Sequence, residues 1–196
     1  IISGKDEARL IYNGVKTDIF EKNFLVVDIG GGSTEFIWQN NNEIRELSLD
    51  IGAVRLTERF LAKDYDILKE EKYNKVKRYI KKQINSSKLK EIGAKKVVGV
   101  GGTITTLATM DLKLDQYDSE KIHHYSLSKR NIDNILDILM NKSLADRKAI
   151  KGLNPQRADI ITAGTIILKV IMDFFSFENI IISERDILFG MINEVK

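Results

Sequence analysis

The stretch Val26-Val27-Asp28-Ile29-Gly30-Gly31-Gly32-Ser33-Thr34-Glu35-Phe36 decides how this chain of 196 residues is interpreted. An apolar strand ends on one carboxylate, Asp28, three glycines follow, and a second carboxylate, Glu35, comes soon after them. Glycines let main-chain N–H groups approach a polyanion closely, because no Cβ intervenes. Carboxylates repel phosphate, so they suit such a loop if they hold a divalent metal or position a water molecule. The stretch therefore predicts a metal-assisted phosphate site.

The composition is that of a globular chain with a sizeable core. Hydrophobic residues make up 43% of it, and 31 basic residues nearly balance 28 acidic ones, so overall charge gives no argument for a nucleic-acid partner. There is no cysteine, which excludes disulfides and cysteine metal sites and fits a reducing compartment. No apolar run is long enough for a membrane span, and the N-terminus lacks the features of a secretory signal. We expect a cytoplasmic protein with no membrane partner.

The pattern along the chain predicts a mixed α/β fold. Apolar alternation predicts strands at Phe24–Ile29, Thr34–Trp38 and Glu43–Leu49, and short apolar runs predict two more at Lys96–Val100 and Asn179–Ile182. Helices are expected at Ser3–Val15, Gly52–Ala62, Asp66–Leu89, Thr103–Met110, Ser128–Asn141, Ser143–Ile150, Pro155–Phe175 and Asp186–Val195. A meander followed by alternating strands and helices predicts one domain, with helices on both faces of a sheet.

A second glycine turn, Gly101-Gly102-Thr103, follows the expected strand Lys96–Val100. A turn that opens a helix offers free N–H groups and the positive end of the helix dipole to a phosphate or ribose. Alone, such a turn is often only a point of tight packing. Two of them at strand ends in one small domain strengthen the prediction of a phosphate site.

Glu7 is a candidate general base. Hydrolysis of a phosphoanhydride needs a group that takes a proton from the attacking water, and Asp28 and Glu35 are already assigned to metal. An acid in the first turn of a helix is more often a stabilising charge near the dipole, and the residues alone leave both interpretations open.

Several segments, in order along the chain, resemble the exopolyphosphatase and guanosine pentaphosphate phosphohydrolase (Ppx/GppA) family. They are Ile2–Val15 (Ile-Ser-Gly-x-x-Glu-Ala-Arg-Leu-Ile-Tyr-x-Gly-Val), Asp28–Glu35, Ser48–Glu58, Val100–Thr103, His123, Gly152–Asp159 and Gly164. The likeness covers essentially the whole chain. That family belongs to the actin-like ATPase superfold, which has two similar lobes with the active site between them. The resemblance therefore implies a ribonuclease H-like lobe.

The resemblance also implies a role for each candidate residue. Glu7 would be the base for the attacking water, while Asp28 and Glu35 would bind Mg²⁺ or order that water. The implied phosphate-binding residues are Gly30, Gly31, Gly32, Ser33 and Thr34 of the first turn, with Gly101, Gly102 and Thr103 lining the region that holds adenosine in related ATPases. The implied substrate is inorganic polyphosphate or a guanosine alarmone, from which terminal phosphate is released.

The resemblance places residues 1–196 as the second lobe only. The chain begins Ile1-Ile2-Ser3 without methionine, and the family's first lobe, with its own phosphate loop, has no counterpart here. We expect a fragment with little or no activity alone, whose exposed lobe-facing surface could support a homodimer. The segment Glu184–Gly190 departs from the family pattern, because Leu188 and Phe189 replace the usual arginine and glutamate.

Two other functions stay open. A kinase of the same superfold would use similar glycine loops, although the segment Ser3–Arg9 argues against it. A non-catalytic regulator that binds nucleotide alarmones would also need them. Phosphate release with and without acceptors, and alarmone binding without hydrolysis, would separate these alternatives from a hydrolase.

Two further features are interpreted as structural. The lysine-rich segment Lys69–Lys96 could follow a polyanion, but a solvated helix face interspersed with Glu70, Glu71 and Glu91 is the favoured interpretation. His123 and His124 suggest a metal, but adjacent side chains are expected to point in different directions and no third ligand is apparent.

Overall fold

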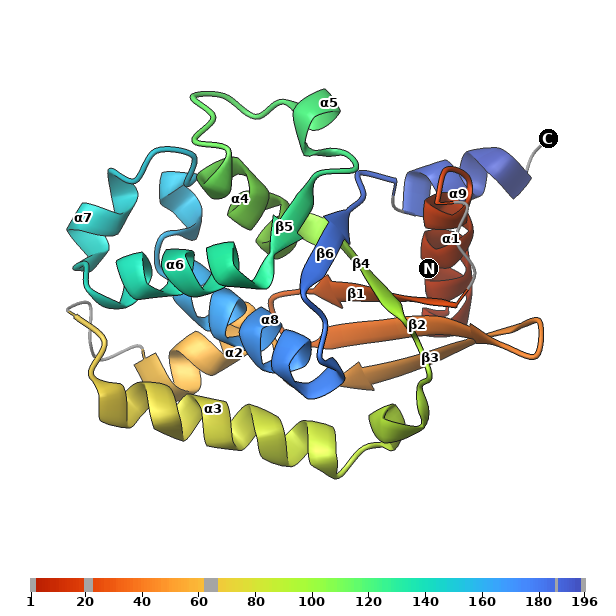
Figure 1. Cartoon of the computed structure of the whole chain (residues 1–196), viewed down its shortest axis with the longest axis horizontal. Coiled ribbons are helices and arrows are strands. Elements are labelled where there is room, and N and C mark those ends of the chain that lie inside the picture. The colour runs from red at the N-terminus through yellow and green to blue at the C-terminus, as the bar shows by residue number, and fades with distance from the viewer. Residues whose placement is uncertain (1–2, 20–22, 62–66, 186, 195–196) are drawn as a thin grey trace.

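The computed structural model describes residues 3–19, 23–61, 67–185 and 187–194. A six-stranded sheet lies at its centre, with strand order β3-β2-β1-β4-β6-β5 (Figure 1). The strands are β1 Phe24–Ile29, β2 Thr34–Asn40, β3 Glu43–Leu49, β4 Lys96–Val100, β5 Ser126–Ser128 and β6 Asn179–Ile182. The first three form an antiparallel meander, β4 runs parallel to both β1 and β6, and β5 is antiparallel to β6. The mixed sheet predicted from the sequence is confirmed.

Helices cover both faces of this sheet. The α-helices are α1 Gly4–Lys16, α2 Ala53–Leu56, α3 Glu70–Asn85, α4 Gly101–Asp111, α5 Ser119–Ile122, α6 Lys129–Met140, α7 Leu144–Lys148, α8 Ile161–Phe175 and α9 Ile187–Glu194. The π-helix η1 spans Thr57–Leu61, and the 3₁₀ turns η2 and η3 span Lys88–Glu91 and Pro155–Arg157. Within the described ranges, no helix is both long and apolar enough to cross a bilayer.

Some predicted boundaries were wrong for local reasons. The helix expected over Pro155–Phe175 divides, because Asn154 caps a short 3₁₀ turn and the long helix α8 begins only at Ile161. The helix expected to reach Leu89 ends at Asn85, where the hydroxyls of Ser86 and Ser87 donate to carbonyls of the last turn. Strand β5 and helix α5 were not predicted. The expected ends at Ala62, Asp66, Asp186 and Val195 lie outside the described residues.

The two faces of the sheet have different partners, because alternate residues of a strand point to opposite sides. On one face, Val26 of β1 packs with Ala8 and Ile11 of α1, and Tyr12 stacks on Phe24 with ring centroids 4.8 Å apart. On the other face, β1 contributes to a larger core beneath α3, α4, α6 and α8. Asp28 follows Phe24 and Val26 in the alternation, so its side chain belongs to the α1 face.

The carboxyl ends of β1, β4 and β6 lie at one edge of the sheet, because these strands are parallel. The first glycine turn leaves β1 at this edge, and the second leaves β4. In open α/β sheets, ligands bind outside the carboxyl ends of the strands. The fold therefore brings both predicted glycine turns to the edge where a ligand is expected.

Candidate active site

The first glycine turn is held from behind by the start of α2. The N–H of Ala53 donates to the carbonyl of Gly30 (2.9 Å), and the N–H of Arg55 donates to that of Gly31 (3.0 Å). The Nε of Arg55 donates to the carbonyl of Gly32 (2.7 Å). These bonds satisfy three successive carbonyl oxygens within the protein and fix the shape of the turn.

The N–H groups of the same turn are left available. In the described part of the chain, the N–H groups of Gly31, Gly32 and Ser33 donate to no backbone carbonyl. Gly31 and Gly32 are exposed, and Ser33 is half-buried. Successive N–H groups in a turn form a concave site that attracts anions. The turn is therefore suited to phosphate oxygens, as the sequence predicted.

Gly52 makes this arrangement possible, and sequence reasoning did not single it out. A Cβ at position 52 would lie 2.3 Å from the carbonyl oxygen of Gly31. Only glycine allows α2 to approach the turn closely enough to bind its carbonyls. The available signal was a glycine at the first position of an expected helix, within the segment Ser48–Glu58.

The two predicted metal ligands lie side by side. Asp28 of β1 is directly opposite Glu35 of β2, and Glu35 is directly opposite Ser48 of β3. The Ser48 hydroxyl donates to Glu35 Oε1 (2.9 Å). Opposite residues of antiparallel strands have Cβ atoms about 5 Å apart on the same face. Two half-buried carboxylates at this spacing fit Mg²⁺, which binds one or two carboxylates and keeps several waters.

The second glycine turn touches the first acid. Gly101 has a φ of +81°, and a Cβ built on it would lie 2.2 Å from Asp28 Oδ1. The position is therefore restricted to glycine both by backbone conformation and by the neighbouring carboxylate. Because α4 begins at Gly101, the positive end of that helix lies beside Asp28.

Two predicted phosphate-binding residues turn their side chains inward. The hydroxyl of Thr34 donates to the Ile51 carbonyl (2.5 Å), and that of Thr103 donates to the Ile29 carbonyl (2.8 Å). Both residues are buried. Their hydroxyls tie the glycine turns to neighbouring segments, so any contact of these residues with phosphate would have to come from their backbone.

Glu7 lies in the exposed first turn of α1, next to an acid with a different role. Asp6 accepts a hydrogen bond from the Ser3 hydroxyl (2.6 Å), which lowers the pKa of Asp6, and it also pairs with Arg9. The Glu7 carboxylate forms no hydrogen bond or ion pair with any other described residue. Asp6 is therefore the structural acid of this turn, and Glu7 is available.

The beginning of α1 lies near the paired acids. Gly4 is adjacent to Glu46 of β3, since a Cβ on Gly4 would lie 3.7 Å from Glu46 Oε1. Glu46 is two residues from Ser48, the partner of Glu35, and α1 covers the face to which Asp28 belongs. The structure thus places Glu7, Asp28 and Glu35 on one face of the sheet.

A cavity of about 620 Å³ opens beside the second glycine turn, with Gly101, Gly102, Tyr117, Arg157 and Glu184 among its lining residues. The Arg157 guanidinium lies against Gly102, where a Cβ would be 2.2 Å from Nη2. Among the residues described, Arg157 forms no ion pair with a carboxylate. A cation and the start of α4 therefore face the same cavity. Sequence reasoning included Arg157 only in the segment Gly152–Asp159 and gave it no role.

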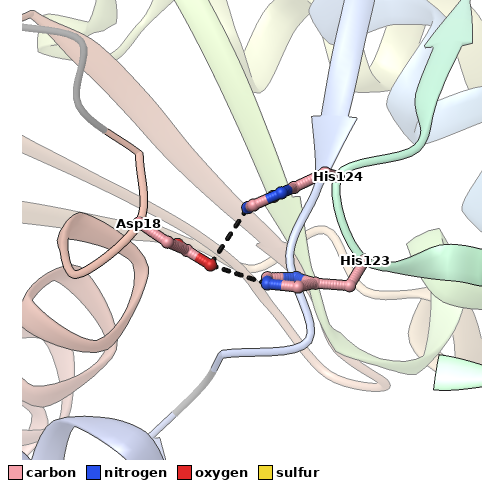
Figure 2. A group of neighbouring side chains, drawn as sticks. All are labelled: Asp18, His123 and His124. Carbon is pink, nitrogen blue, oxygen red and sulfur yellow. Dashed lines mark hydrogen bonds and ion pairs between the residues drawn. The ribbon is translucent and has the colours of Figure 1, made fainter. Parts of the chain in front are cut away.

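A second cluster joins both histidines to a carboxylate (Figure 2). The Nε2 atoms of His123 and His124 lie 2.6 and 3.0 Å from the same oxygen of Asp18, Oδ2. The two rings stack with centroids 4.0 Å apart, and His124 has a φ of +65°. This left-handed conformation turns His124 toward the side that His123 faces. The prediction that the two side chains diverge was wrong, and Asp18 is the third member of the cluster, which the sequence did not reveal.

This cluster has the composition of a metal site, but a hydrogen bond to His123 argues against that role. The N–H of Glu184 donates to His123 Nδ1 (3.2 Å), so Nδ1 is an acceptor and Nε2 carries the proton that Asp18 receives. A metal needs the lone pair on Nε2, and Arg185 Nε already lies 2.9 Å from Asp18 Oδ2. We therefore interpret the cluster as a structural clamp between the ends of α1, α5 and β6.

The sequence matches the model of the Ppx/GppA phosphatase family over residues 1–195. This chain belongs to the Ppx/GppA phosphatase family. The predicted resemblance is therefore confirmed.

Individual proteins with similar sequences or structures agree with this family membership. A Ppx/GppA phosphatase structure from Aquifex aeolicus superimposes with a TM-score of 0.89 at 30% identity, covering 98% of this chain and 64% of that one. A bifunctional 3-dehydroquinate synthase/phosphatase of Fusobacterium nucleatum is 40% identical over 98% of this chain and 30% of its own length. Exopolyphosphatase 2 of Mycobacterium tuberculosis is 30% identical over 97% of this chain and 62% of its own length. The chain thus spans less than two thirds of each of these Ppx/GppA relatives.

Proposed function

We propose that this chain is part of a hydrolase that releases terminal phosphate from inorganic polyphosphate or guanosine pentaphosphate. The observation that carries the proposal is the meeting of two open glycine turns and two facing carboxylates at one edge of the sheet. Membership of a phosphatase family and similarity to an exopolyphosphatase support it.

In this proposal, Glu7 and the N–H groups of the first glycine turn have separate catalytic roles. Glu7, whose carboxylate is unengaged within the described residues, accepts the proton of the attacking water. The N–H groups of Gly31, Gly32 and Ser33 receive the negative charge on the transferred phosphoryl oxygens. Because α2 holds the turn from behind, these donors are oriented before substrate arrives.

Asp28 and Glu35 would hold Mg²⁺, and the Ser48 hydroxyl would orient Glu35. When bound, the ion would neutralise charge on the phosphate oxygens. Gly101 leaves the space that the Asp28 carboxylate needs.

We further propose that a first lobe, present in the longer relatives, supplies the opposite wall of the site. Without it, half of the groups that position substrate are missing, so the isolated chain should show little activity. Self-association through the exposed lobe-facing surface and a cytoplasmic location stay predictions.

The test compares Glu7→Gln with Asp6→Asn in the full-length protein that contains this chain. We expect Glu7→Gln to lower phosphate release by about 10²–10⁴-fold with substrate binding retained, because it removes the general base. Asp6→Asn should leave turnover nearly unchanged. Undiminished turnover in Glu7→Gln would contradict the assignment. Transfer only to an added hydroxyl acceptor would indicate a kinase, and alarmone binding with no hydrolysis would indicate a regulator.

A further inference from the structure

The carbonyls and the N–H groups of the first glycine turn belong to the same peptide groups. A peptide joins the carbonyl of one residue to the N–H of the next, and the two point to opposite sides of one plane. The Gly30 carbonyl, bound by the Ala53 N–H, therefore shares its peptide with the N–H of Gly31. The Gly31 carbonyl, bound by the Arg55 N–H, shares its peptide with the N–H of Gly32.

This arrangement has an electrostatic consequence for the N–H groups. A hydrogen bond to the carbonyl of a peptide polarises that peptide and makes its N–H a stronger donor, because hydrogen bonds in a chain reinforce one another. The third peptide follows the same pattern, since the carbonyl of Gly32 is bound by Arg55 Nε and the N–H belongs to Ser33. Each of the three available N–H groups thus has a donor from α2 at the other end of its peptide.

The Gly32–Ser33 peptide differs from the other two, because its carbonyl is bound by a cation. Arg55 Nε donates to the Gly32 carbonyl at 2.7 Å, whereas the carbonyls of Gly30 and Gly31 accept neutral backbone N–H groups at 2.9 and 3.0 Å. A guanidinium stays charged in proteins, and a hydrogen bond from an ionised donor is about twice as strong as a neutral one. The Ser33 N–H is therefore the most strongly polarised of the three.

The guanidinium of Arg55 is held in this place by a second contact. Its Nη2 lies 3.1 Å from Asp50 Oδ1. The Asp50 side chain is 78% exposed, so water screens the pair and the carboxylate offsets only part of the charge at the turn. Two of the three guanidinium nitrogens are engaged within the protein, which favours action through the turn over direct contact with a substrate.

We propose that Arg55 is a positioning residue that strengthens the Ser33 N–H as a donor to an oxygen of the transferred phosphoryl group. It does so by holding its charge against the carbonyl of Gly32. Donors aimed at developing charge stabilise a transition state, and a more positive N–H stabilises it further. The effect on turnover rests on the proposed function, whereas the polarisation of the peptide is a property of this lobe alone.

Substitutions at Arg55 separate the charge from the hydrogen bond. Arg55→Gln places a neutral amide nitrogen the same number of bonds from Cα as Nε, so it can still donate to the carbonyl. Arg55→Met donates nothing, and Arg55→Lys keeps the charge. As controls, Asp50→Asn removes the ion pair and leaves the bond to Gly32. Arg59→Gln removes an equal charge four residues later, where the arginine contacts Tyr79.

The first measurement is the nuclear magnetic resonance of the backbone amides in the ¹⁵N-labelled 196-residue chain. Loss of the donor at the Gly32 carbonyl should move the nitrogen and proton resonances of the Ser33 amide upfield, because its peptide is less polarised. We expect a shift in Arg55→Gln and a larger one in Arg55→Met. The Gly31 amide, whose peptide is bound by Ala53, should not move in either variant. Both controls should leave Ser33 near its wild-type position.

The second measurement is phosphate release by the full-length protein. We expect kcat to fall about five-fold in Arg55→Gln and about thirty-fold in Arg55→Met, because a weakened donor costs less than the loss of one. The change in KM should be smaller than the change in kcat. Arg55→Lys should lie between the wild type and Arg55→Gln, and Asp50→Asn and Arg59→Gln should resemble the wild type.

Three outcomes would overturn the proposal. Asp50→Asn could reproduce the losses of Arg55→Gln, which would make the ion pair the important contact. Turnover could fall while the Ser33 amide stays in place, which would indicate direct contact with substrate, or the amide could stay in place in both variants. If Arg55→Met does not fold, Arg55→Gln carries both measurements. Failure of the hydrolase proposal would instead leave the wild type without phosphate release and the shift of the Ser33 amide intact.

Discussion

Two regions of this molecule have the residues of a metal or phosphate site, and they differ in what those residues do with their hydrogen-bonding capacity. Around the first glycine turn, the carbonyls are bound by α2 while the N–H groups and the Glu7 carboxylate are left available. Around Asp18, two histidines and an arginine direct their donors at one oxygen. Residue type alone marks both regions, but at Asp18 three donors already meet at Oδ2, and the other oxygen, Oδ1, is buried and has no hydrogen-bond partner among the described residues. We therefore propose a reactive site at the glycine turn and a structural clamp at Asp18.

The largest expected effect is on turnover, through a substitution at the first glycine turn site. Asp28→Asn in the full-length protein should lower phosphate release by about 10²–10³-fold, because it removes a proposed metal ligand worth several kcal/mol in the transition state. The thermal unfolding midpoint should change little. A variant with normal turnover would show that Asp28 is structural, and the distinction between the two regions would then fail.

The second largest expected effect is on the stability of the protein, through a substitution at Asp18 in the clamp. Asp18→Asn should lower the free energy of unfolding by about 2–3 kcal/mol, because a nearly buried carboxylate that accepts charge-assisted hydrogen bonds is lost. Denaturant unfolding measures this, with Glu43→Gln as the control. Glu43 forms an exposed pair with Arg45, and its loss should cost no more than about 0.5 kcal/mol. Equal losses in the two variants would contradict the clamp.

A separate hydrogen-bonded cluster around Asp111 gives a pH-dependent test. Asp111 accepts hydrogen bonds from the Tyr125 hydroxyl (2.5 Å) and from Asn131 Nδ2 (2.8 Å). Burial and the hydrogen bond to Asp111 raise the pKa of Tyr125 to about 12, from 10.0. Because the folded pKa is the higher one, the stabilisation is complete below pH 10 and is lost as pH rises toward 12. Burial also raises the pKa of Tyr12 and Tyr73, so ultraviolet titration of tyrosinate should show several late transitions, and the one near pH 12 should be absent in Tyr125→Phe.

The smallest expected effect is that of zinc on the clamp. Since His123 Nδ1 accepts the hydrogen bond from the Glu184 N–H and Arg185 binds the same carboxylate, the thermal midpoint should be equal in zinc and in chelator. A zinc-dependent rise in the midpoint that disappears in His124→Ala would show that the cluster is a metal site after all.

The sequence predicted what depends on local pattern. Alternation placed β1 and β3 at their observed bounds, and the short loop between β1 and β2 made Asp28 and Glu35 opposite partners. The clamp could not be predicted, because Asp18 and His123 are 105 residues apart and meet only through the packing of α1 against the sheet. The positive φ of His124 is likewise imposed by tertiary structure.

The contact between Arg157 and Gly102 could not be predicted from the sequence either. Both residues lie in segments that resemble the family, yet nothing in either segment indicates that a guanidinium would lie against a glycine of another helix.

The division of the helix predicted from Pro155 has a local cause that could be recognised in the sequence. Asn154 before proline is a strong cap for a short turn, and the apolar pattern does not by itself show where α8 begins.

The bonds from α2 to the glycine turn have a consequence for conformational entropy. Three successive glycines are the most flexible backbone a chain can offer, and ordering each residue costs about 1–2 kcal/mol. Here the turn is ordered when the lobe folds, because the N–H groups of Ala53 and Arg55 and the Arg55 side chain bind its carbonyls. A phosphate therefore binds to donors that are already oriented. Its affinity is not lowered by the conformational entropy that flexible glycines would otherwise lose on binding.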